Sequence, residues 1–222
     1  PAIMFKNSQC PVVIGPNRIQ AAKHLMENTD SNVILSDDGL QHFSLGRDIE
    51  ILMIDGNRKF GNELLLPAGP LREPKSRIKT VDFTISSNKK WPSVAKYEMK
   101  YRPFKWVHMK SQKEYDIFDW PLKKEVNAVA GIGNPINFFN LLSEYKFKID
   151  KTIAFPDHYQ FSKSEILDIL NDAKKNDCQV LVTEKDYYKI KKYDLKEVKF
   201  LKVRLEIENK LDFLKKIDSI YA

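Results

Sequence analysis

The sequence predicts an α/β fold with two α/β/α lobes joined by a short β linker. Short apolar runs alternate with stretches of helical periodicity along most of the chain, which is typical of a sheet covered by helices. Between residues 89 and 115 this order gives way to short stretches with a period of two, which indicates half-exposed antiparallel strands. We therefore expect a first lobe over 1–88, a β linker over 89–115 and a second lobe over 116–222.

The first lobe contains short apolar runs separated by one helical stretch and one long loop. Pro16 opens the helix, because proline suits the first helical turn. The loop is rich in Gly and Pro, and long ordered loops in compact domains are usually functional. The expected elements are a strand over 11–14, a helix over 16–27, strands over 32–35 and 49–54, a loop over 57–79 and a strand over 81–86.

The same kinds of pattern predict the elements of the linker and of the second lobe. Alternation predicts linker strands over 97–101 and 105–109. Ser162 and Glu165 have the S-x-x-E spacing of a capping box, so a helix should begin directly after Ser162. The second lobe should contain a strand over 126–130, a helix over 136–145, a strand over 151–154, a helix over 163–176, strands over 179–183 and 198–203, and a final helix from 210.

Composition restricts the class of protein without choosing a function. The chain has 222 residues, a formal net charge of +7 and two cysteines that lie far apart, outside any metal-ligand spacing. It has no apolar run of about 18 residues, which excludes a membrane-spanning helix in this sequence. A basic surface favours nucleic acid, anionic phospholipid or a phosphorylated substrate, and the charge does not decide among these three.

The stretch from Val33 to His42 is the clearest candidate for chemistry. An apolar run ends there in Asp37, Asp38 and Gly39, and ligands of α/β sheets bind beyond the carboxyl ends of such strands. Two carboxylates at this position suit Mg²⁺ and its waters beside a nucleotide. The alternative is that these aspartates only cap a helix or form a turn.

Six strings, in this order, give the chain a resemblance to a known family. They are DDGLQH over 37–42, DGNRKFGN over 55–62, LPAGPLREP over 66–74, AGIGNP over 130–135, FPDHY over 155–159 and TEKD over 183–186. Together they resemble the tetraacyldisaccharide 4'-kinases of lipid A biosynthesis, and DDGLQH and LPAGPLREP are long and specific. The resemblance implies transfer of the ATP γ-phosphate to the 4'-hydroxyl of an acylated glucosamine disaccharide 1-phosphate, with Mg²⁺.

The resemblance also implies a setting for the reaction. The substrate lies in a membrane, so the expected location is the cytoplasmic face of the inner membrane of a Gram-negative bacterium, with peripheral attachment to the membrane surface. Nucleic acid is not an expected partner. The rival hypothesis is a non-catalytic basic protein that binds RNA or anionic lipid.

The chain departs from the family in one respect. It contains no GxxxxGK[ST] loop, the backbone cradle for nucleotide phosphates that the family carries before the DD segment. We therefore expect a partial, P-loop-kinase-like first lobe that belongs to a longer protein. The 222-residue chain alone should bind ATP poorly and lack kinase activity.

Each motif supplies candidate site residues. Asp37 and Asp38 are predicted to act in catalysis and to bind the metal, with Glu73 as a third metal ligand. Arg72 offers a bidentate fork to phosphate, and the alternative is an Arg72–Glu73 pair that only fixes the loop.

The other candidates are histidines and residues that follow a strand. His158, in the FPDHY segment, is predicted to support the carboxylate that takes the hydroxyl proton, as the resemblance implies. His42 is expected to face substrate or to fix its turn, and both readings stay open. Asn57 and Arg58 follow a strand end and are predicted to contact the disaccharide or its phosphate, with a turn after Asp55 as the alternative.

Overall fold

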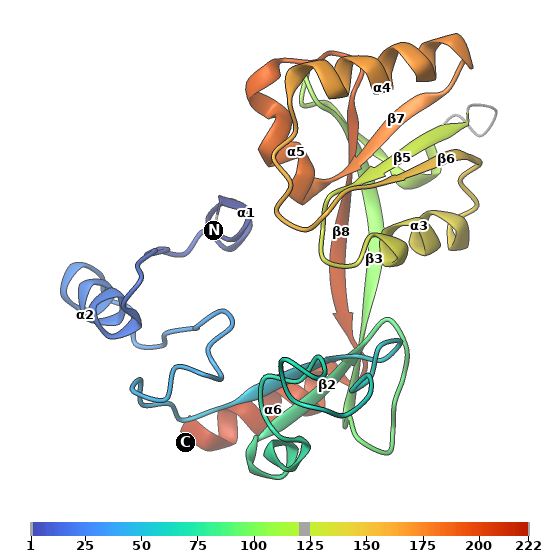
Figure 1. The fold of residues 1–222 in the computed structure, drawn as a ribbon. Coiled ribbons are helices and arrows are strands. Elements are labelled where there is room, and N and C mark those ends of the chain that lie inside the picture. The colour runs from blue at the N-terminus through green and yellow to red at the C-terminus, as the bar shows by residue number, and fades with distance from the viewer. Residues whose placement is uncertain (1, 120–124, 222) are drawn as a thin grey trace. The chain divides into compact units, whose positions relative to one another are not determined.

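The structure is a computed structural model that describes residues 2–119 and 125–221. Its contacts divide the chain into two compact units, which are described separately. Unit 1 comprises residues 1–100 and 207–222, and unit 2 comprises residues 101–206. The mixed helices and strands in Figure 1 confirm the predicted α/β class. The predicted limits of lobes and linker, at 88/89 and 115/116, stay a prediction.

Unit 1 is built on parallel strands with one helix packed against them. Strands β1 (Ile51–Asp55), β2 (Phe83–Ser87) and the first part of β3 (Tyr97–His108) pair in that order, and all are parallel. Helix α6 (Lys210–Tyr221) brings Phe213 to within 5.2 Å of the Phe83 and Tyr97 rings. Unit 1 also contains α1 (Ala2–Ser8), α2 (Arg18–Asn28) and the 3₁₀ helix η1 (Lys75–Thr80).

Unit 2 is a sheet with helices on both faces. Its strands are ordered β3, β8 (Lys199–Ile207), β7 (Gln179–Thr183), β5 (Val126–Ala130) and β6 (Ile149–Ala154), and β4 (Glu114–Asp116) pairs antiparallel with β3. Helix α3 (Pro135–Glu144) covers one face, and α4 (Lys163–Lys175) and α5 (Glu184–Ile190) cover the other (Figure 1). The short 3₁₀ helices are η2 (Ile117–Asp119) and η3 (Lys191–Tyr193).

The central strands of unit 2 are apolar because both of their faces are buried. Along β5, Val129 faces the cluster under α4 and α5, whereas Val126, Ala128 and Ala130 face the cluster under α3. None of these four residues is exposed. This two-sided burial explains why a mostly apolar run predicts β5, and likewise β7, with the observed bounds.

Two further predictions about unit 2 are confirmed. Ser162 caps α4: its Oγ accepts from the Glu165 amide at 3.2 Å, and the Glu165 carboxylate accepts from the Ser162 amide at 2.8 Å. The predicted second-lobe helices and strands all occur within a few residues of their expected bounds. Helix α5 follows β7 directly, because Thr183 caps it through its side chain.

Two predicted strands of unit 1 are wrong. Residues 11–14 and 32–35 have no strand assignment in the part of the chain that the structure describes. Val33, Ile34 and Leu35 are 49%, 37% and 86% exposed, so their apolar side chains lack the two-sided cover that defines a central strand. Asp37 and Asp38 therefore follow an irregular segment here, not a strand.

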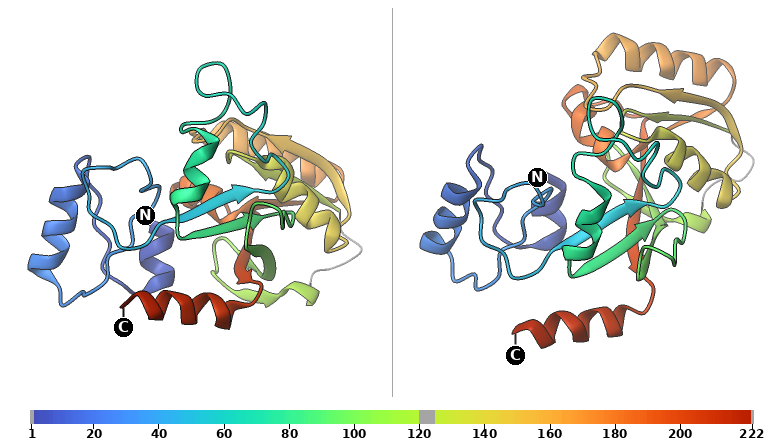
Figure 2. Two further views of the ribbon diagram at one scale, coloured as in Figure 1. Left: turned by 90° about the horizontal axis from the view of Figure 1, so that it is seen from below. Right: turned by 60° about the horizontal axis from the view of Figure 1, so that its bottom comes forward.

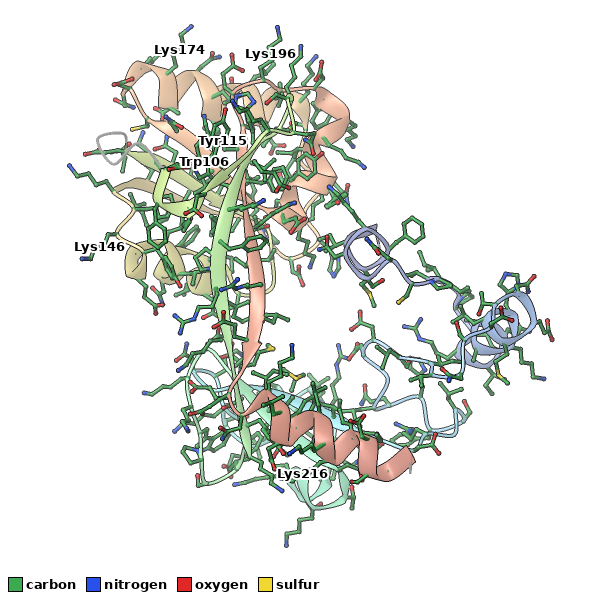
Figure 3. The ribbon with its side chains drawn as sticks, turned by 180° about the vertical axis from the view of Figure 1, so that it is seen from behind. Trp106, Tyr115, Lys146, Lys174, Lys196 and Lys216 are labelled. Atoms are coloured by element: carbon green, nitrogen blue, oxygen red, sulfur yellow. The ribbon has the colours of Figure 1, made fainter. Side chains whose placement is uncertain are left out.

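The linker is also built differently from the prediction. One strand, β3, runs through both expected segments, and it is parallel to β2 at Tyr97–Met99 and antiparallel to β4 at Lys105–Val107. Trp106 of β3 stacks on Tyr115 of β4 with ring centroids 4.2 Å apart (Figure 3). The burial of β3 does not alternate, because its two ends belong to the cores of different units.

Candidate functional site

The DDGLQH segment forms a tight, exposed turn in unit 1. Asp38 has a left-handed backbone with φ of 52°, and a Cβ on Gly39 would lie 2.9 Å from Ser36 Oγ, so the glycine suits this turn. The His42 amide donates to the Gly39 carbonyl at 3.0 Å. The turn therefore presents the carboxylates of Asp37 and Asp38 to solvent.

Arg72, from the LPAGPLREP segment, reaches this turn. Its Nη1 lies 3.2 Å from Oδ2 of Asp38, across 34 positions of sequence. The two side chains are 60% and 77% exposed, and exposed pairs of this kind contribute about 0–1 kcal/mol to stability. The contact brings together a predicted metal ligand and a predicted phosphate ligand, and it leaves both accessible.

A chain of partly buried ion pairs fixes the same two segments. Glu73 Oε2 lies 3.1 Å from Arg77 Nε, and the Arg77 guanidinium also binds Glu50, which holds Arg47 at 2.9 Å. Hydrogen bonding to Glu50 is the main cause that raises the pKa of Arg77. These four side chains are only 12–22% exposed.

The last member of this chain holds the DDGLQH turn. Arg47 Nη1 donates to the carbonyls of Gly39 at 3.2 Å and Leu40 at 2.9 Å. The series Glu73–Arg77–Glu50–Arg47, named the ion chain from here on, thus connects the LREP segment to the turn that carries the two aspartates. Sequence reasoning missed Arg47, Glu50 and Arg77. No local signal marked them, because spacings of three and four predict contacts only on a helix, and these residues fall in segments predicted as strand or loop.

Two of the three predicted metal ligands are suited to Mg²⁺. Asp37 and Asp38 are exposed carboxylates, and Mg²⁺ usually binds proteins through one or two carboxylates and keeps several waters. Glu73, in contrast, is held by Arg77. Among the described residues, the three predicted ligands do not gather within 4.8 Å; the group that does is Glu125, Asp150 and Cys178 in unit 2. The roles of Asp37, Asp38 and Glu73 in metal binding stay predictions.

Asn57 and Arg58 lie in a turn at the end of β1. Oδ1 of Asp55 accepts from the Asn57 amide at 2.9 Å and the Arg58 amide at 3.3 Å. A Cβ on Gly56 would lie 1.8 Å from the carbonyl oxygen of Lys89, so only glycine fits there. The turn after Asp55, which was the alternative to a substrate contact by Asn57 and Arg58, is present in the structure. The exposed side chains of Asn57 and Arg58 remain candidates for substrate contact.

Three of the six family strings meet at one edge of the sheet in unit 2. AGIGNP follows β5, FPDHY follows β6 and TEKD spans the end of β7, and these strands are parallel neighbours. The carboxyl ends of parallel strands form the usual ligand-binding edge of an α/β sheet.

Asp186 is the buried centre of this edge. Its Oδ2 accepts from the Gly131 amide at 2.9 Å and from Thr183 Oγ1 at 2.7 Å, and its Oδ1 lies 2.8 Å from Lys189 Nζ. Lys189 also donates to the Gly131 carbonyl at 2.6 Å. Asp186 has no exposed surface, and Lys189 is only 13% exposed. The pair therefore locks the glycine turn after β5 to the start of α5.

His158 lies beside an exposed ion pair at the same edge. Asp157 binds Lys185 at 3.1 Å, and this hydrogen bond is the main cause that lowers the pKa of Asp157. His158 has a left-handed φ of 59°, its amide donates to Asp157 Oδ1 at 2.9 Å, and its Nε2 lies 3.7 Å from Asp157 Oδ2. The imidazole is 81% exposed, so it is open to a ligand.

Lysines occur on several elements and loops of both units. Exposed lysines project from separate elements and loops, as Lys146, Lys174 and Lys196 of unit 2 and Lys216 of α6 illustrate (Figure 3). No helix in the described residues is long and apolar enough to cross a bilayer.

Comparison with known proteins decides the family. The family model described as tetraacyldisaccharide-1-P 4'-kinase, LpxK, matches residues 1–221. This chain belongs to the LpxK family. Proteins named tetraacyldisaccharide 4'-kinase from Shewanella woodyi and Legionella pneumophila (strain Corby) are 41% and 40% identical to it, over 96% and 94% of its length.

The chain spans about three fifths of these LpxK relatives, 59% of the first and 61% of the second. It is also similar to the crystal structure described as the "apo" form of LpxK from Aquifex aeolicus in complex with ATP. The TM-score is 0.67 at 26% identity, over 92% of this chain and 62% of that one. The family match confirms the resemblance drawn from the six strings.

Proposed function

We propose that this chain takes part in the ATP-dependent transfer of a phosphate to the 4'-hydroxyl of tetraacyldisaccharide 1-phosphate. The observation that carries the proposal is the exposed contact between Arg72 and Asp38 in a chain of the LpxK family. An exposed pair of a phosphate-binding cation and a metal-binding carboxylate suits phosphoryl transfer, which depends on positioning and on neutralising charge.

Each residue has a proposed role in that transfer. Asp37 and Asp38 would hold Mg²⁺ directly or through water, and the ion would offset the charge on the phosphate oxygens. Arg72 leaves Asp38 and binds phosphate oxygens with two parallel N–H donors. The ion chain keeps the DDGLQH turn and the LREP segment in place while Arg72 changes partner.

The hydroxyl proton needs an acceptor. As the 4'-oxygen forms its bond to the γ-phosphorus, the bond from that phosphorus to ADP breaks, and the proton passes to a base. His158 is proposed to support the carboxylate that serves as this base, and its exposed imidazole is suited to that task. His42, Asn57 and Arg58 are proposed to contact the sugar or its phosphate. The setting is the surface of the inner membrane, on its cytoplasmic face.

The chain lacks a GxxxxGK[ST] loop, so we propose that it binds ATP weakly and transfers no phosphate alone. The test is transfer of radiolabelled γ-phosphate to detergent-dispersed tetraacyldisaccharide 1-phosphate. It uses the chain alone and the chain extended at its amino end by a segment with a phosphate-binding loop. Transfer by the extended form only is the expected result. No transfer by either folded form would favour a binding protein for RNA or anionic lipid.

In the active form, Arg72→Gln and Asp38→Asn should each lower kcat/KM at least 100-fold. Removing one donor to developing charge typically costs about 10²–10³ in rate. Arg204→Gln is the matched control, because Arg204 forms an equally exposed ion pair with Glu206 at 3.0 Å, and it should change kcat/KM less than twofold. An Arg72→Gln variant as active as Arg204→Gln would refute the proposed role of Arg72.

A further inference from the structure

The loop between β1 and η1 presents three consecutive leucines to solvent. Leu64, Leu65 and Leu66, named the leucine tip from here on, are 52%, 45% and 62% exposed. Single exposed leucines are common, whereas contiguous exposed apolar residues mark a surface that contacts something.

The backbone holds the leucine tip in place. The Leu66 amide donates to the Leu71 carbonyl at 2.9 Å, and the Leu71 amide donates to the Leu64 carbonyl at 3.1 Å. A Cβ on Gly69 would come within 2.3 Å of the Leu64 carbonyl oxygen, so the loop closes tightly on itself. Figure 2 shows the loop, in teal, extending away from the strands of unit 1. The leucines are therefore fixed in an exposed position.

Cations and aromatic rings lie at the base of the loop. Lys75 binds Glu63 at 2.7 Å, next to the leucine tip, and lies 5.6 Å from the Phe60 ring centroid. Lys59 lies 5.2 Å from the Trp91 ring centroid, and Trp91 packs on Phe60 at 4.8 Å. Residues 57–80 contain six Lys or Arg and two Glu, a net charge of +4.

We propose that the leucine tip inserts into an anionic lipid bilayer, with the exposed Lys59 and Lys75 at the level of the phosphate headgroups. Aliphatic residues with flanking cations and a tryptophan are the features of proteins that attach to a bilayer interface. The net charge of +4 argues against a second copy as the occupant, because two such loops would repel each other across a twofold interface. The proposal rests on the proposed function for the lipid substrate and adds the segment that docks to its membrane.

The first test measures binding to vesicles of phosphatidylcholine with and without phosphatidylglycerol. Leu64→Ser/Leu66→Ser should weaken binding to the anionic vesicles at least tenfold. The matched control is Leu205→Ser/Leu211→Ser, which removes two leucines that are 55% and 76% exposed elsewhere, and it should stay within twofold of the parent. Equal binding by the two double variants would overturn the proposal.

The second test places a probe on the loop. Leu66→Cys, with Cys10 and Cys178 replaced by serine, is labelled with an environment-sensitive fluorophore and compared with Leu211→Cys. Anionic vesicles should shift the emission to the blue at position 66 and leave position 211 unchanged. A blue shift at 66 that appears without lipid and grows with protein concentration would overturn the proposal in favour of self-association.

These tests separate the two proposals. Neither uses ATP or the disaccharide, so vesicle binding through the leucine tip, combined with no phosphate transfer by the folded extended form, refutes only the proposed function. Transfer to detergent-dispersed acceptor by an active form whose leucine tip binds no vesicle refutes only the membrane contact.

Discussion

Arg72 and Asp38 stay mostly exposed while they form an ion pair, and this exposure allows the pair to open without much cost. Arg77 differs, because it binds Glu50 and Glu73 with side chains that are 12–21% exposed. The two arginines lie five positions apart in sequence and have distinct tasks: Arg72 is available to a ligand, and Arg77 holds the loop that carries it.

Arg77→Gln should lower the denaturant midpoint of unfolding clearly, whereas Arg72→Gln should leave it nearly unchanged. Loss of Arg77 leaves the partly buried Glu50 and Glu73 without a shared cation. It should also speed amide exchange in the DDGLQH turn, because Glu50, which binds Arg47 at 2.9 Å, loses its second contact with an arginine and is held less firmly. Identical midpoints for the two variants would show that the ion chain does not stabilise the loop.

Asp186→Ala should destabilise unit 2 by about 3–5 kcal/mol, because it leaves the ammonium of Lys189 buried without its carboxylate. Guanidinium denaturation measures this loss. Asp157→Ala is the control, since Asp157 is 42% exposed and its loss should cost far less. A small effect of Asp186→Ala would mean that water replaces the carboxylate.

At the scale of single elements, Glu114 connects three strands. Its carboxylate on β4 binds Lys105 of β3 at 2.6 Å and Lys202 of β8. Hydrogen bonding to Lys105, followed by that to Lys202, lowers the pKa of Glu114 to about 2. A carboxylate with a depressed pKa stabilises the folded state above its ordinary pKa, and this contribution is lost as the pH falls toward the folded value.

Glu114→Gln should therefore lower the free energy of unfolding most above pH 4.5. The difference in this free energy between variant and parent should shrink as the pH falls from 4.5 to about 2. Denaturant midpoints of both proteins across this range measure the difference. A gap that stays constant with pH would show that packing of the side chain, and not its charge, holds β4 to its neighbours.

The elements that could be predicted are those whose signals are local. Mostly apolar runs predict β5 and β7, and the Ser162–Glu165 spacing predicts the start of α4. The prediction of a strand over 32–35 was wrong, because apolar residues form a central strand only where neighbouring elements cover both of its faces. The Arg72–Asp38 contact joins segments that are far apart in sequence, and so does the ion chain. The motifs therefore predicted which residues could bind a metal or phosphate, but not which residues contact one another.

On the scale of the whole molecule, stability should be unevenly distributed. Strands β5 and β7 are almost fully buried, whereas residues 33–38 have exposed side chains and belong to no strand. Regions with few buried contacts open at low free energy and exchange their amide hydrogens quickly.

Hydrogen exchange followed by mass spectrometry should show this contrast. Amides of residues 33–35 should exchange within the earliest time points, and those of 126–130 should be the slowest in the chain. Protection of 33–35 comparable to that of β5 would show that these residues pair with a strand after all, as the sequence pattern predicted.

The division into units has a consequence for biosynthesis. Unit 2 lies between two parts of unit 1, because the chain leaves unit 1 after Lys100 and returns at Ile207. The core of unit 1 includes Phe213 of α6, which packs on Phe83 and Tyr97. A ribosome therefore releases every residue of unit 2 before it supplies the last helix of unit 1. Of these two units, the one whose synthesis begins first is the one that completes its core last.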